Sequence, residues 1–87
     1  MVYVDKSKTG YQGMVMCHMI ADTHDELVSM ADRIGVKRKW IQDAGTYREH
    51  FDVCANMKQT AIKNGAKEIG LISLGRILAR KILEESK

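Results

Sequence analysis

The sequence has no proline, only two cysteines and few aromatic residues, with one tryptophan, one phenylalanine and three tyrosines. Cys17 and Cys54 form neither a disulfide framework nor a CxxC metal knuckle, so we interpret both as buried free thiols. The longest apolar run, Met14–Ala21, is interrupted by His18 and is far shorter than the roughly 20 residues of a membrane-spanning helix. The start of the chain also lacks the basic and apolar segments of a signal peptide. We therefore expect a cytoplasmic protein with no membrane partner.

A strong imbalance of charge is lacking as well. Fourteen Lys and Arg residues stand against eleven Asp and Glu residues, and the resulting net charge of +3 does not indicate a nucleic-acid-binding protein. We interpret Arg76 and Arg80, one helical turn apart, as a solvated helix face.

No compact metal-ligand motif is present, so we expect neither a metal nor another cofactor. A chain of 87 residues allows one domain, residues 1–87, with a marginal core, which favours a homo-oligomer.

The first half of the sequence predicts two strands and a helix. Residues 2–4 are β-branched or aromatic and predict a strand, and residues 5–13 have the composition of a loop. Met14–Ala21 is apolar on both faces of the predicted strand, which is typical of a central strand that is covered on both sides. Thr23 and Glu26 have the spacing of a capping box, in which each side chain binds the other's backbone amide, and Gly35 is a good terminator. We therefore predict a helix over residues 23–34.

The second half predicts shorter elements. Residues 37–42 end in an aromatic and a β-branched residue and predict a short strand followed by a loop. The apolar spacing predicts a helix over residues 54–63, a strand over residues 68–72, and a last helix capped by Ser73. The predicted order is β-β-α-β-α-β-α. This is an α/β fold with one small sheet and about three helices packed on it.

Several short segments, taken in their order and spacing, resemble a family of short bacterial and bacteriophage proteins, domain-of-unknown-function family 4031. These segments are residues 2–5 (VYVD), 17–18 (CH), 21–22 (AD), 25–27 (DEL), 40–42 (WIQ), 50–53 (HFDV) and 64–66 (NGA). The sequence departs from the family pattern at Phe51, where a Tyr is expected, and at Cys54, where a Ser or Thr is expected. The resemblance implies no activity. It implies a phage accessory protein that interacts with its host.

The polar residues that could do chemistry are scattered along the chain. His18 lies within an apolar strand, where burying an imidazole costs free energy unless both ring nitrogens find partners. We therefore expect a polar partner, either the backbone or an acid such as Asp5 or Asp52. His18 is then either a satisfied core histidine or a ligand for phosphate or ribose. His50 and Asp52 precede the helix predicted from residue 54, where Asp52 could cap the helix or the exposed amides of its first turn could form an anion site. If these four side chains converge, they form a polar pocket suited to acid-base chemistry or to a divalent metal.

A second candidate feature is the basic triplet Lys37, Arg38 and Lys39, which is followed by Trp40. Cations beside an aromatic ring can bind a phosphate while the ring stacks on a base. The alternative is a solvated turn in which Trp40 anchors the core.

We expect a small phage-type accessory protein that binds or sequesters an anionic, nucleotide-like ligand, such as a host immune signalling nucleotide, without catalysis. The alternatives are a phosphoester or nucleotide hydrolase that uses His18, His50 and Asp52, and an inhibitor that blocks a host protein by surface contact. The predicted ligand-binding residues are Asp5, His18, Lys37, Arg38, Lys39, Trp40, Gln42, His50, Phe51 and Asp52.

Overall fold

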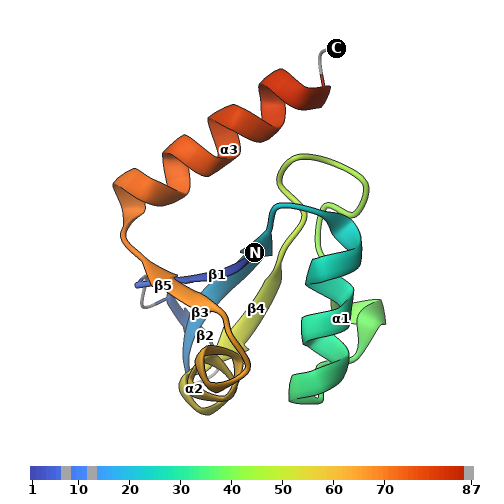
Figure 1. Ribbon diagram of the computed structural model, residues 1–87. Coiled ribbons are helices and arrows are strands. Elements are labelled where there is room, and N and C mark those ends of the chain that lie inside the picture. Colours follow the sequence, from blue (N-terminus) through green and yellow to red (C-terminus); the bar gives the residue numbers. More distant parts are fainter. Residues whose placement is uncertain (7–8, 12–13, 86–87) are drawn as a thin grey trace.

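A mixed β-sheet forms the centre of the molecule. The computed structural model describes residues 1–6, 9–11 and 14–85. In this described part the sheet contains the strands β1 (Val2–Asp5), β2 (Thr9–Tyr11), β3 (Met14–Ala21), β4 (Phe51–Cys54) and β5 (Lys67–Ile69). The helices are α1 (His24–Ile34), α2 (Ala55–Lys63) and α3 (Leu71–Glu85), and a short 3₁₀ helix, η1, covers Arg38–Trp40. The α/β class is confirmed (Figure 1).

Strand β3 is the central strand, as its apolar pattern predicts. It pairs antiparallel with β2, with β1 and with β4. Met16 is paired with both Thr9 and Cys54, and Met19 with both Val4 and Phe51. Because a strand has two edges, β4 lies along one edge of β3, and β1 and β2 share the other. Strand β5 adds a parallel partner to β1.

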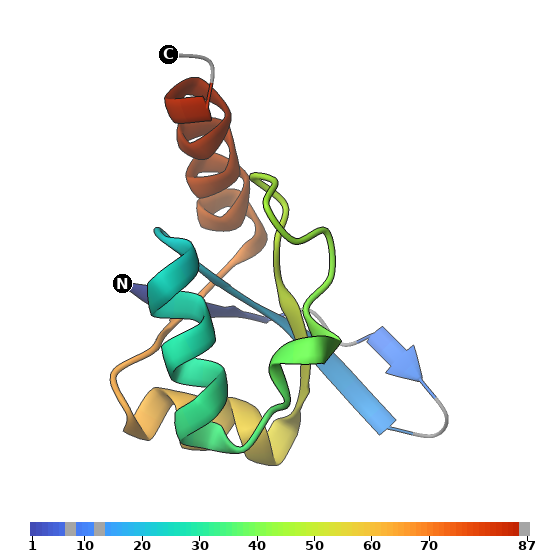
Figure 2. The same ribbon diagram turned by 90° about the vertical axis from the view of Figure 1, so that its right-hand side faces the viewer.

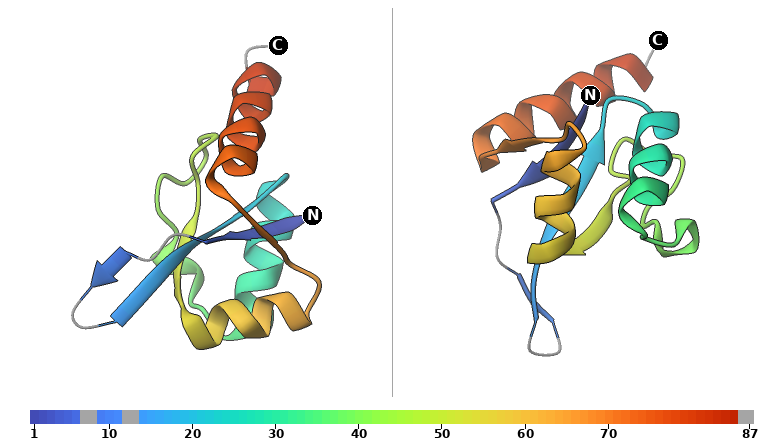
Figure 3. Two further views of the ribbon diagram at one scale, coloured as in Figure 1. Left: turned by 90° about the vertical axis from the view of Figure 1, so that its left-hand side faces the viewer. Right: turned by 60° about the horizontal axis from the view of Figure 1, so that its bottom comes forward.

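Helices α1 and α2 cover one face of this sheet. The side chain of Thr23 accepts a hydrogen bond from the Glu26 amide at 3.2 Å, and Gly35 ends α1 in the left-handed conformation with φ of 82°. Glu26 accepts a bond from the Thr23 hydroxyl rather than reaching the backbone of the cap residue. Figure 3 shows both helices on the same side of the strands. The buried side chains of Leu27 and Ala61 join the strand residues in the core.

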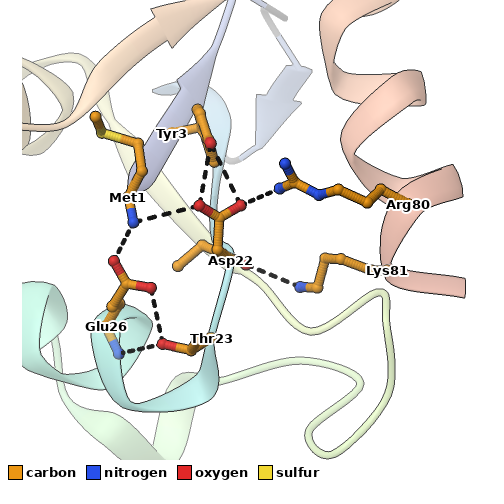
Figure 4. Close-up of polar contacts among 8 residues, drawn as sticks. Met1, Tyr3, Asp22, Thr23, Glu26, Arg80 and Lys81 are labelled. Carbon is orange, nitrogen blue, oxygen red and sulfur yellow. Dashed lines mark hydrogen bonds and ion pairs between the residues drawn. The ribbon is translucent and has the colours of Figure 1, made fainter. Parts of the chain in front are cut away.

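Helix α3 lies on the opposite side of the sheet from α2 (Figures 1 and 2). Two cations tie it to the end of β3. Lys81 donates a hydrogen bond from Nζ to the carbonyl of Ala21 at 3.0 Å, and Arg80 pairs with the carboxylate of Asp22. Figure 4 shows that Asp22 also accepts from the Tyr3 hydroxyl and faces the amino group of Met1, which pairs with Glu26. No helix in the described part is long and apolar enough to cross a bilayer.

Several predicted boundaries are wrong. Residues 37–42 do not form a strand: η1 occupies Arg38–Trp40, and only Gln42 makes an isolated bridge, to His50. The predicted loop over residues 5–13 contains β2, while residues 7–8 and 12–13 lie outside the described residues. Strand β5 ends at Ile69, so Ser73 lies within α3 and not at its cap. Asp52 lies inside β4 and caps no helix, because Cys54 is the cap residue of α2.

Candidate functional site

The candidate site lies on the sheet face opposite α1 and α2, and strand alternation places its residues there. In a strand, successive side chains point to opposite faces. Val4, Met19 and Phe51 are paired neighbours in the core, so the adjacent residues Asp5, His18 and Asp52 project from the other face. His18 and Asp52 are register partners. Asp5, His18 and Asp52 therefore form a row across β1, β3 and β4.

His18 is held firmly by Asp5. Its Nδ1 donates to Asp5 Oδ2 at 2.7 Å, and its backbone amide donates to Asp5 Oδ1 at 3.0 Å. The Asp5 carboxylate is only 1 % exposed, whereas the His18 side chain is 38 % exposed. Both bonds compensate the cost of burying this carboxylate and fix the orientation of the imidazole ring. The expected polar partner of His18 is therefore an acid, Asp5.

His50 brings a second imidazole to the same place. It precedes β4, and because it is two residues from Asp52 it projects from the same face. Its ring centre lies 5.3 Å from that of His18, with the rings near perpendicular at 74°. Its Nδ1 donates to the backbone carbonyl of Arg48 at 2.7 Å. Asp52 Oδ1 lies 3.8 Å from Nε2 of His18 and 3.6 Å from Nε2 of His50.

Gln42 completes the cluster from the segment that follows η1. Its side-chain amide donates to Asp52 Oδ2, and its backbone amide and carbonyl exchange hydrogen bonds with those of His50 at 2.9 and 3.1 Å. Gln42 therefore positions both residues. Of the predicted ligand-binding residues, the structure brings together Asp5, His18, Gln42, His50 and Asp52.

An open pocket of about 390 Å³ adjoins the two imidazoles. Its lining residues come from β3, from the loop before β4 and from α3: His18, Ile20, Asp43, Arg48, His50, Leu74 and Leu78. The site thus combines an apolar wall with convergent polar groups, as small-molecule sites do. A pocket of similar volume, about 410 Å³, lies between Met1, α1 and the end of α2, but it has no imidazole in its lining.

The remaining predicted residues lie elsewhere. Arg38 pairs with Asp32 at 2.6 Å, which raises the pKa of the guanidinium and lowers that of the carboxyl. Trp40 is 53 % exposed, with Lys37 Nζ 5.7 Å from its ring centre, so the interpretation of Trp40 as a core anchor is wrong. Lys39 is exposed on η1. Phe51 is fully buried in the core, on the face away from the pocket.

Sequence reasoning missed Arg48, Asp43 and the apolar wall of Ile20, Leu74 and Leu78. The alternation of polar and apolar residues from His50 to Val53 would have placed His50 and Asp52 on the same face of a strand. In the structure the exposed Asp52 does lie between the buried Phe51 and Val53. No local pattern relates Arg48 to α3. Their meeting depends on contacts between residues far apart in the sequence.

The fold and this site define a small α/β protein with a histidine- and aspartate-lined pocket on one sheet face. The chain belongs to the family described as "Protein of unknown function (DUF4031)", whose model matches residues 2–81. This confirms the family resemblance. No match was found among curated proteins or among solved structures.

Proposed function

We propose that the protein binds a small anionic, nucleotide-like ligand in the pocket beside His18 and His50 and does not turn it over. The observation that carries this proposal is the convergence of both imidazoles and Arg48 on one open pocket with an apolar wall. Its volume of about 390 Å³ lies within the roughly 300–1,000 Å³ typical of small-molecule sites. A phage accessory protein that sequesters a signalling nucleotide needs no more than such a site.

The pocket offers a place for both halves of a nucleotide. Arg48 can donate hydrogen bonds to phosphate oxygens, and Nε2 of each imidazole can accept one from a ribose hydroxyl, because both Nδ1–H groups already bind Asp5 and the Arg48 carbonyl. Ile20, Leu74 and Leu78 form the apolar side, against which a base or ribose can pack. Trp40 does not line this pocket, but its exposed ring, two residues before Gln42, is accessible for stacking on a base.

A second candidate is hydrolysis of a phosphoester, which the Asp5–His18 contact favours. A carboxylate that binds Nδ1 of an imidazole holds the tautomer whose Nε2 can accept a proton. The Asp52 carboxylate, 3.8 Å from that Nε2, lies where an attacking water could be oriented. Hydrolysis therefore uses the same cluster as binding and differs from it only in the products.

A nucleotide panel distinguishes the candidates. The purified protein is incubated with the panel, with and without divalent metal, and the bound fraction is analysed by mass spectrometry before and after denaturation. We expect one intact nucleotide to be released on denaturation. New products formed by the wild-type protein and absent from His18→Gln and His50→Gln would establish the hydrolase. Failure to retain any nucleotide would contradict the proposal and favour an inhibitor that acts by surface contact.

Affinities of variants then locate the site. His50→Gln should weaken ligand binding by about 0.5–1.5 kcal/mol, the usual contribution of a neutral hydrogen bond. Arg48→Ala should reduce the salt dependence of binding, because screening acts on its attraction to phosphate. The matched control is His24→Gln, since His24 pairs with Glu49 outside the cluster. Equal losses in His24→Gln and His50→Gln would contradict this location.

A further inference from the structure

We propose that His18, His50 and Asp52 form a binding site for a divalent first-row transition metal ion, such as Zn²⁺. Each residue offers one ligand atom, and these three atoms all lie within 4.8 Å of one another. Two imidazoles and one carboxylate are a donor set that leaves coordination positions open for water or a substrate. The proposal does not depend on nucleotide binding, because the site consists of protein atoms alone.

The contacts behind the histidines orient them as metal ligands. Nδ1 of His18 is bonded to the Asp5 carboxylate and Nδ1 of His50 to the Arg48 carbonyl, each at 2.7 Å. Because both partners are acceptors, each Nδ1 carries the proton, and Nε2 is the basic nitrogen of the neutral ring. Metal-bound histidines usually donate their other N–H to such a carboxylate or carbonyl. Both rings show this arrangement, His18 on β3 and His50 just before β4.

The third ligand is oriented in the same way. The Gln42 amide binds Oδ2 of Asp52, and Oδ1 faces Nε2 of His18 at 3.8 Å and Nε2 of His50 at 3.6 Å. An ion at about 2.0–2.2 Å from each ligand in tetrahedral geometry requires ligand separations of roughly 3.3 Å. The two separations that involve Asp52 therefore need to close by about 0.3–0.5 Å, which rotation of the exposed Asp52 side chain can supply. The two imidazole nitrogens lie within 4.8 Å of each other and must also approach for both to bind one ion.

The charges around the site favour a cation. Three carboxylates, those of Asp5, Asp43 and Asp52, belong to the cluster or line its pocket, whereas Arg48 is the permanent cation there among the described residues. A divalent ion offsets this negative charge. It also adds a second positive group, beside Arg48, to which an anionic ligand can bind. That last role alone depends on the proposed function.

The test uses metal and no nucleotide. Untagged protein, stripped with a chelator, is titrated with ZnCl₂ by isothermal calorimetry, and we expect one ion per chain. His50→Gln and Asp52→Asn should each weaken Zn²⁺ binding at least tenfold. Asp5→Asn should weaken it by about 10–100-fold, because Asp5 positions His18 without binding the ion. His24→Gln is the matched control and should leave the affinity unchanged, since His24 also bonds a carboxylate through Nδ1 but lies outside the cluster.

Substitution with Co²⁺ identifies the ligands directly. Nitrogen and oxygen ligation gives visible bands without the intense near-ultraviolet band of a cobalt–thiolate bond, so such a band would assign the ion to Cys17 or Cys54 and overturn the proposal. The absence of 1:1 binding, or an equal loss in His24→Gln, would also overturn it. Asp52 is exposed, so Asp52→Asn remains informative if Asp5→Asn fails to fold. Zn²⁺ binding without nucleotide binding would overturn only the proposed function.

Discussion

At the scale of single residues, successive side chains of a strand point to opposite faces, so the polar residues of the site and the core residues alternate along the chain. Cys17 and His18 are neighbours, yet Cys17 is buried in the core and His18 faces the pocket. The Cys17 thiol donates to the Val53 carbonyl at 3.4 Å, and burial raises its pKa. Cys54 is half-buried at the start of α2, and its side chain makes no capping bond. Both cysteines are free, as expected, but the expectation that both are buried is wrong for Cys54, which is only half-buried.

The two thiols should therefore differ in reactivity. In the native protein, iodoacetamide should modify Cys54 first and Cys17 at least about tenfold more slowly, because Cys17 reacts only when the core opens. Intact-mass time courses of the wild type and of Cys54→Ser measure the two rates, and denatured protein supplies the unprotected control. Equal rates in the native state would contradict the burial of Cys17.

Trp40 gives a second prediction at this scale. Because its ring is 53 % exposed, Trp40→Ala should change the free energy of unfolding by no more than about 0.5 kcal/mol. Urea unfolding followed by circular dichroism measures this, since the protein has no other tryptophan to report by fluorescence. If the variant binds nucleotide about 1–3 kcal/mol more weakly while unfolding normally, the ring stacks on a base. Loss of folding would show that Trp40 supports the core.

At the scale of elements, strong local sequence signals predicted the longer elements, whereas several of the shorter elements were missed or misplaced. The apolar run of β3 and the cap and terminator of α1 predicted both elements to within a residue. Strand β4 was missed because it has four residues and runs directly into α2, so its pattern is too short to separate from a helix start. That omission also hid the row of Asp5, His18 and Asp52. The row follows from strand pairing, which is a tertiary feature.

The cap of α1 can be tested directly. Thr23→Ala should lower the free energy of unfolding by about 1 kcal/mol, because the Glu26 amide loses its side-chain acceptor. Thr23→Ser keeps the hydroxyl and is the matched control. Urea denaturation at one pH gives both values. A Thr23→Ser variant as unstable as Thr23→Ala would show that the methyl group, and not the cap, matters.

At the scale of the whole molecule, α3 has two apolar faces and the chain covers only one. Leu74 and Leu78 face the pocket, and Lys81 is buried against the end of β3. On the other side, residues spaced for one stripe are all exposed: Leu71, Ile72, Gly75, Ala79, Ile82 and Leu83. An added Cβ at Gly75 would meet nothing within 4 Å, so this stripe is open along its middle. Ile72 is 76 % exposed.

We therefore predict that the protein self-associates through α3. Small residues at positions 75 and 79 let two helices approach closely, and each large apolar side chain that becomes buried contributes about 1.5–3 kcal/mol. Sedimentation equilibrium at micromolar concentration should give about twice the chain mass of 9.8 kDa. Ile72→Glu should weaken the dimer at least tenfold, about 1.4 kcal/mol, by placing a charge in the interface. Ser73→Glu adds the same charge one residue further around the helix and should leave it intact. A wild type that sediments as a stable monomer would contradict the prediction.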